Sequence, residues 1–167
     1  MKLDEDTRTH LEQIHLRSAR AAGGSWTPWT QYLPIDEGEA EIAHSGVHVR
    51  HPLHTLGRFS ATSNSAAHLA SWARTHVPLL AGCLLTSQPF LQIADFQRAM
   101  NELAELPPGP WQVNTERPGV HAVGAYPKKV YYLFEGFEGQ LIPTLEFLAA
   151  LPDDLSALSR ALDCCAD

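Results

Sequence analysis

The chain has 167 residues, of which 44% are hydrophobic and 19% are charged, and its formal net charge is −7. These values are typical of one folded domain and argue against wholesale disorder. Twelve basic residues stand against nineteen acidic ones with no run of lysine or arginine, so the electrostatic footprint of a nucleic-acid-binding protein is absent. Such an acidic surface favours solubility or contact with a basic protein.

The first 40 residues predict a helix followed by a loop. Acidic residues at positions 4–6 come before a thin apolar stripe, and a glycine pair at 23–24 offers a stop, so we expect a helix over residues 5–22. Residues 25–39 are rich in tryptophan and proline and are interpreted as an ordered loop whose tryptophans plug the edge of the core. No apolar leader or membrane-length apolar run occurs, which predicts a cytoplasmic protein.

Residues 41–143 are expected to form the core of the domain. Valines alternate with polar residues over 42–50, which predicts a half-buried strand, and a second strand is expected over 57–61. Ser63 or Asn64 then caps a helix that ends at Pro78.

The apolar residues 79–85 are interpreted as a buried strand, and Asp95 as the cap of a helix that stops at the proline-rich residues 107–110. Further strands are predicted over 111–115, 120–126 and 130–135. Residues 144–167 complete the chain with a short helix opened by Pro143 and a closing helix around 155–162.

This order of elements predicts a single α+β domain. Helices and strands mix without a regular βαβ alternation, which favours a mostly antiparallel sheet, possibly split, packed with about four or five helices. The three cysteines include an adjacent pair and form no CxxC motif, which favours a reducing compartment over a disulfide framework.

Four histidines lie within eleven residues: His44, His48, His51 and His54. Imidazole nitrogen is a ligand for zinc or copper. On an extended strand, however, His44 and His48 lie on one face about 13 Å apart, which is too far to share one ion. No cysteine or carboxylate accompanies them, so surface or hydrogen-bonding histidines are favoured and no metal is expected.

A candidate nucleotide site rests on a resemblance. Residues 57–63 (Gly-Arg-Phe-Ser-Ala-Thr-Ser) and the alanine-rich residues 67–73 resemble the second conserved block of ADP-ribosyltransferases, a strand with an STS-like triplet followed by a helix. Residues 119–123 and 131–143 resemble the closing strands of the same fold. The likeness covers about residues 42 to 143.

In that family these blocks line a split sheet that holds NAD. The resemblance therefore implies a site for NAD or a related nucleotide, with the candidate residues His44, Gly57, Arg58, Phe59, Ser60, Thr62 and Ser63. The family's catalytic acid should open the strand where this chain has Val130 and Tyr131, and Glu135 and Glu138 lie later. No catalytic residue is assigned for this reason. A pocket that binds a nucleotide without turning it over is the alternative to an active enzyme.

Two functions follow from the sequence. One is an ADP-ribosyltransferase-like domain that binds NAD, whether active or degenerate. The other is a small acidic protein-interaction module, such as an immunity or inhibitor protein that neutralises a toxin or enzyme. Its aromatic anchors would include Trp26, Trp29 and Tyr131. A protein partner is expected in the second case, a small nucleotide in the first, and nucleic acid or membrane in neither.

Overall fold

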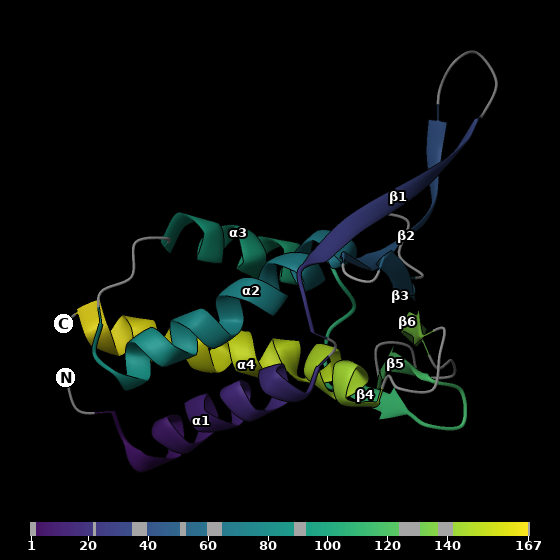
Figure 1. Cartoon of the computed structure of the whole chain (residues 1–167). Coiled ribbons are helices and arrows are strands. Elements are labelled where there is room, and N and C mark those ends of the chain that lie inside the picture. Colours follow the sequence, from purple (N-terminus) through teal and green to yellow (C-terminus); the bar gives the residue numbers. More distant parts are fainter. Residues whose placement is uncertain are drawn as a thin grey trace.

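A computed structural model describes residues 3–21, 23–34, 40–50, 53–59, 65–88, 93–123, 131–136 and 142–166. Within them the chain forms four helices and one six-stranded antiparallel sheet in a single domain (Figure 1), which confirms the predicted α+β class. The helices are α1 (Glu5–Arg20), α2 (Ser65–Leu85), α3 (Ile93–Ala104) and α4 (Ile142–Ala166). The strands are β1 (Trp26–Pro34), β2 (Ala40–Arg50), β3 (Leu53–Phe59), β4 (Trp111–Asn114), β5 (Gly119–Ala122) and β6 (Tyr131–Gly136).

The sheet has the strand order β1-β2-β3-β6-β5-β4, so β1 and β4 are its edges. The far ends of β1 and β2 extend beyond the layer of helices (Figure 1). Helix α2 contacts β1 and β2, α4 contacts β4 and β5, α1 packs on both α2 and α4, and α3 packs on α2. The helices therefore form layers on one face of the sheet.

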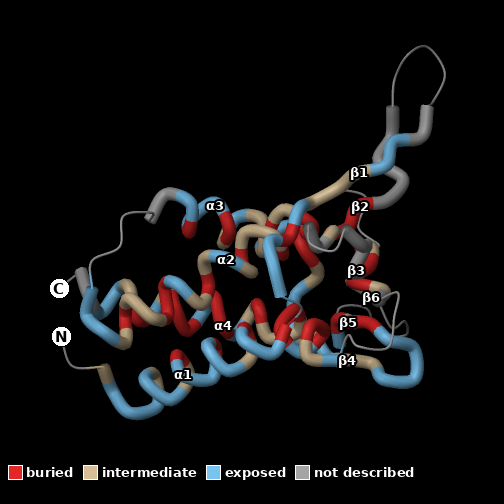
Figure 2. Tube along the Cα trace, viewed as in Figure 1, coloured by how far each residue is buried: buried red, intermediate tan, exposed pale blue. Residues whose placement is uncertain are grey.

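The core lies between α2, α4 and the strands (Figure 2). Successive side chains of a strand point to opposite faces. Four buried residues lie on one face of the sheet. Phe134 pairs in register with Phe59 and with Val120, and Val47 pairs with Gly57, two residues from Phe59. They define the face of the sheet that meets the helices.

Helix α1 forms as its sequence predicts. The Asp4 side chain accepts a hydrogen bond from the Thr7 backbone N–H at 2.8 Å, which caps the N-terminus, while Arg17 and Arg20 lie in the last turn. Leu11 and Ile14 are fully buried against the other helices. The helix ends two residues before the predicted boundary.

The loop interpretation of residues 25–39 is wrong for the part that the structure describes, because residues 26–34 are strand β1. Trp26 is buried, as expected for a plug at the core edge, and its ring meets Phe147 edge-on. Pro28 and Pro34 fit a strand here because β1 is an edge, where a proline nitrogen can face away from the sheet.

Two helices continue through a proline, in places where the sequence predicted that a helix ends. Helix α2 continues through Pro78, so residues 79–85 are helical and the buried strand predicted there is wrong. Helix α4 continues through Pro152, so the two predicted C-terminal helices are one. In both cases the apolar stripe continues beyond the proline, and burial of that stripe offsets the lost backbone hydrogen bond.

Smaller boundaries also differ. Strand β3 begins at Leu53, earlier than predicted, and α3 begins at Ile93, so Asp95 lies in its first turn and is not its cap. The strands predicted over 111–115 and 130–135 are confirmed as β4 and β6, and β5 ends at Ala122. Among the described residues, no helix is both long and apolar enough to cross a bilayer.

Candidate functional site

The predicted nucleotide residues divide into those the structure describes and those it does not. Strand β3 ends with Gly57, Arg58 and Phe59. The next residues in the sequence, 60–63, are rich in hydroxyl side chains. Ser60, Thr62 and Ser63 lie outside the described residues. The backbone of His44 lies in β2 opposite Gln31, but its side chain is outside the described part.

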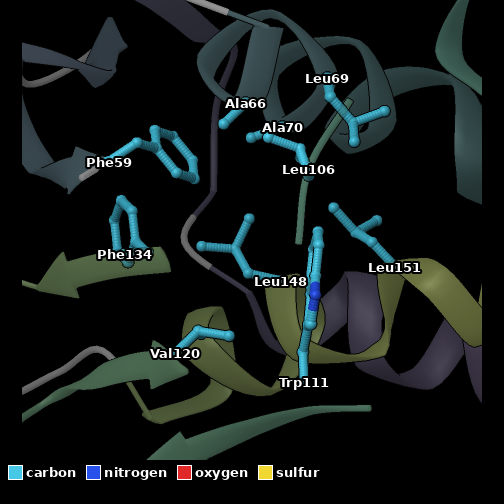
Figure 3. Close-up of a pocket in the computed structure, with 10 residues that line it drawn as sticks. All are labelled: Phe59, Ala66, Leu69, Ala70, Leu106, Trp111, Val120, Phe134, Leu148 and Leu151. Carbon is cyan, nitrogen blue, oxygen red and sulfur yellow. The ribbon is translucent and has the colours of Figure 1, made fainter. Parts of the chain in front are cut away.

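Phe59 lies at an apolar pocket beneath the sheet (Figure 3). Its ring packs on Phe134 at 4.9 Å between centroids. The free volume is about 10 Å³, and the walls are Phe59, Ala66, Leu69, Ala70, Leu106, Trp111, Val120, Phe134, Leu148 and Leu151. Trp111 brings the only side-chain nitrogen among these ten, and its Nε1–H donates to the Pro107 carbonyl at 2.9 Å. The ten lining side chains therefore offer no unused hydrogen-bonding group.

Arg58 points to the opposite face from Phe59, because the two are consecutive in a strand. It pairs in register with Glu135 of β6, and its Nε and Nη2 groups donate to Glu135 Oε2 at 3.0 and 2.8 Å. Arg117, in the turn before β5, donates to Oε1 at 3.1 Å. The hydrogen bonds from Arg58 and then Arg117 hold the pKa of Glu135 below its ordinary value of 4.5.

An aromatic pair lies on the same face as Arg58. The Trp29 indole stacks on the His48 ring at 5.7 Å with 29° between the planes. Trp29 pairs in register with Gly46, where a Cβ would lie 2.6 Å from the indole carbons. Gly46 is therefore the residue that lets the indole lie flat on the sheet.

Register places these groups in one row. Trp29, Gly46, Arg58, Glu135 and Gly119 follow one another across β1, β2, β3, β6 and β5. We call the surface formed by Trp29, His48, Arg58, Arg117 and Glu135 the open face, because the described helices all lie on the other side of the sheet (Figure 1). Sequence reasoning missed this surface because Trp29 was assigned to a loop and the Arg58–Glu135 pair depends on the order of the strands.

A second charged cluster is buried between α1 and α4. Asp154 is fully buried, and its Oδ1 accepts hydrogen bonds from Arg17 Nη2 and from His10 Nε2, the latter at 3.0 Å. Burial raises the pKa of Asp154 above its ordinary value of 3.8, against the lowering effect of Arg17 and His10. The second oxygen, Oδ2, has no hydrogen-bond partner. This cluster ties the first helix to the last.

The histidine segment forms no metal-binding group in the part of the chain that the structure describes. No three histidine, cysteine, aspartate or glutamate side chains lie together there. Of the four clustered histidines, only His48 has a described side chain, and it stacks on Trp29. His51 lies outside the described residues, and the side chains of His44 and His54 do as well.

Comparison with known proteins finds no family model, no curated protein and no solved structure that matches this chain. The resemblance to ADP-ribosyltransferases therefore stays a prediction.

Proposed function

We propose that this protein is a small acidic protein-interaction module that binds another protein through the open face of its sheet, in the manner of an immunity or inhibitor protein. One observation supports it: an aromatic pair and an arginine–glutamate–arginine cluster lie side by side on the sheet face that none of the described helices covers. Tryptophan and arginine are the residue types that contribute most to the binding energy of protein interfaces.

The geometry of the open face suits recognition because its side chains are already held in place. Arg58 and Arg117 are fixed by the Glu135 carboxylate, and Trp29 lies against Gly46 and His48. Side chains ordered before binding lose less conformational entropy when a partner arrives. We place this interaction in the cytoplasm, since Cys83 and Cys164 are free thiols and suit a reducing compartment.

Site-specific photo-crosslinking tests this proposal. A photoreactive residue replaces Thr27, which is exposed and pairs in register with His48, and the control replaces Glu12, which is exposed on α1. We expect a discrete cross-linked complex from position 27 and none from position 12. The yield from position 27 should fall when Arg58→Ala is added. Equal cross-linking from both positions would contradict an interface on the sheet.

A second candidate function is the binding of NAD or a related nucleotide, and one contact favours it. Phe59 and Ala66 both line the same small pocket (Figure 3), and in the sequence they stand on either side of the hydroxyl-rich residues 60–63. At a hundred times its dissociation constant, NAD would stabilise the fold by about 2.7 kcal/mol.

Thermal unfolding with NAD and with ADP-ribose tests this candidate. A rise in Tm that Arg58→Ala leaves unchanged would support binding on the pocket side, since Arg58 lies on the other face. Unchanged Tm with both ligands would remove the nucleotide from consideration and leave the interaction module.

A further inference from the structure

The two edges of the sheet differ in what they offer to another strand. An edge strand presents unpaired main-chain N–H and C=O groups, which a further strand can bind. Strand β4 is only four residues long, and a very short edge leaves little to pair with. Strand β1 has nine residues, no described strand pairs with its outer side, and its far end extends beyond the layer of helices (Figure 1). The edge at β1 therefore needs protection of its own.

The sequence of β1 makes this edge prone to association. Its nine residues, Trp-Thr-Pro-Trp-Thr-Gln-Tyr-Leu-Pro, include no charged side chain, although charge is a common protection of an edge strand. Residues 29–33 combine strand-forming side chains with zero charge and no proline, a pattern typical of segments that pair with copies of themselves. Tyr32, within this stretch, is 56% exposed. Such a stretch on an uncovered edge would bind a second copy of the chain unless something prevents it.

Two prolines bound this stretch, and their nitrogens point the same way. In an antiparallel strand, alternate residues direct their N–H and C=O groups at one neighbouring strand, and the residues between them direct these groups away. Pro28 and Pro34 pair in register with Val47 and Ala40 of β2, and a proline nitrogen has no hydrogen to donate to β2. Both nitrogens therefore face outward. The alternation along β1 is kept between them, because the extra residue at the register shift, Ala43, lies in β2.

The prolines shorten the outward-facing row of donors. The same alternation makes Thr30 and Tyr32 the outward-facing residues between Pro28 and Pro34, so these two carry the N–H groups that remain for another strand. At each proline the ring takes the place of the hydrogen and would overlap the carbonyl group of an incoming strand. Pairing that begins at Thr30 and Tyr32 therefore cannot extend past either proline.

We propose that Pro28 and Pro34 prevent β1 from pairing with β1 of a second copy of this chain. The pairing that they block is antiparallel about a two-fold axis at Gln31, since this register places Thr30 opposite Tyr32 of the second copy and Pro28 opposite Pro34. A strand contact limited to the few residues between the prolines is marginal in water. The proposal concerns main-chain groups at the edge, so it stands independently of the interface proposed for the open face.

Size-exclusion chromatography with light scattering tests the proposal on the whole protein. Wild type is compared with Pro28→Thr/Pro34→Thr, in which threonine restores both N–H groups and favours a strand. We expect a monomeric wild type and a variant that dimerises at least about a hundredfold more tightly, because the pair regains main-chain hydrogen bonds at both ends. Circular dichroism checks that the variant keeps the fold. The single variants Pro28→Thr and Pro34→Thr, each expected to dimerise more weakly, replace the double variant in the test if it does not fold.

Two further variants identify the surface that associates. Adding Thr30→Pro to the double variant returns a ring to the outward-facing row and should restore the monomer. Adding Gln31→Cys should instead give a disulfide-linked dimer with oxidised glutathione, because two-fold pairing places the Cα of residue 31 about 4.5 Å from that of its copy. The double variant, which keeps the three native cysteines, is the control and should cross-link no more than the wild type. The proposal is overturned if the double variant is as monomeric as the wild type, if Thr30→Pro leaves it dimeric, or if Gln31→Cys alone cross-links equally well.

Discussion

The buried cluster at Asp154 and the exposed cluster at Glu135 contain similar groups but behave in opposite ways. Each has one carboxylate between two basic side chains, Arg17 and His10 in the first and Arg58 and Arg117 in the second. Burial raises the pKa of Asp154, whereas hydrogen bonds lower the pKa of Glu135. The position of the carboxylate relative to solvent therefore decides the sign, and the number of basic neighbours does not.

Removal of one partner from the buried cluster gives the largest expected effect. Arg17→Ala leaves the Asp154 carboxylate in the core with only His10, and breaking a buried ion pair in this way costs about 3 kcal/mol or more. Urea denaturation at pH 7 measures the loss. Arg17→Ala in an Asp154→Asn background is the control and should cost much less. A similar loss in both backgrounds would show that Arg17 acts through packing of its side chain.

The pH dependence of stability should have opposite signs at the two carboxylates. Folding favours the protonated form of Asp154, so its contribution is fully present below pH 3.8 and is lost as pH rises through the raised folded pKa. Folding favours ionised Glu135, so its contribution is present above pH 4.5 and is lost as pH falls through the lowered folded pKa.

Difference curves measure both signs. The free energy of unfolding of the wild type minus that of Asp154→Asn should fall as pH rises, while the wild type minus Glu135→Gln should rise. Two curves of the same slope would mean that burial does not separate the clusters.

The smallest effect is expected on the open face. Arg58→Ala removes a partly exposed pair from Glu135 and should lower the free energy of unfolding by only about 0.2–1 kcal/mol. The same urea measurement serves, with Arg98→Ala, which breaks an exposed pair within α3, as the comparison. A loss as large as that of Arg17→Ala would show that Arg58 is essential to the sheet.

The sequence predicted the secondary structure well where one hydrophobic periodicity, of a strand or of a helix, ran without interruption. The alternation over β2 and the capped stripe of α1 both correspond to observed elements. The three largest errors involve proline: β1 was assigned to a loop, and α2 and α4 continue through Pro78 and Pro152. Leu80 and Leu84 continue the buried stripe of α2 after Pro78, and Leu155 and Leu158 continue that of α4 after Pro152. The sequence shows where proline removes a helical hydrogen bond. It does not show which other elements of the fold will bury the apolar stripe and so offset that loss.

The candidate sites were harder to predict because they depend on pairs distant in the sequence. Residues Arg58 and Glu135 become neighbours only when β3 and β6 pair. Nothing in the local sequence of Asp154 identifies Arg17 as its partner.

The ion pair between Arg17 and Asp154 has a consequence for biosynthesis. These residues are 137 positions apart, and translation at about 5–20 residues per second separates their appearance by on the order of ten seconds. During that interval α1 has left the ribosome without α4, one of the two helices that it packs on. The helical layer is therefore completed only late in synthesis, and the nascent chain is most in need of chaperone protection before then.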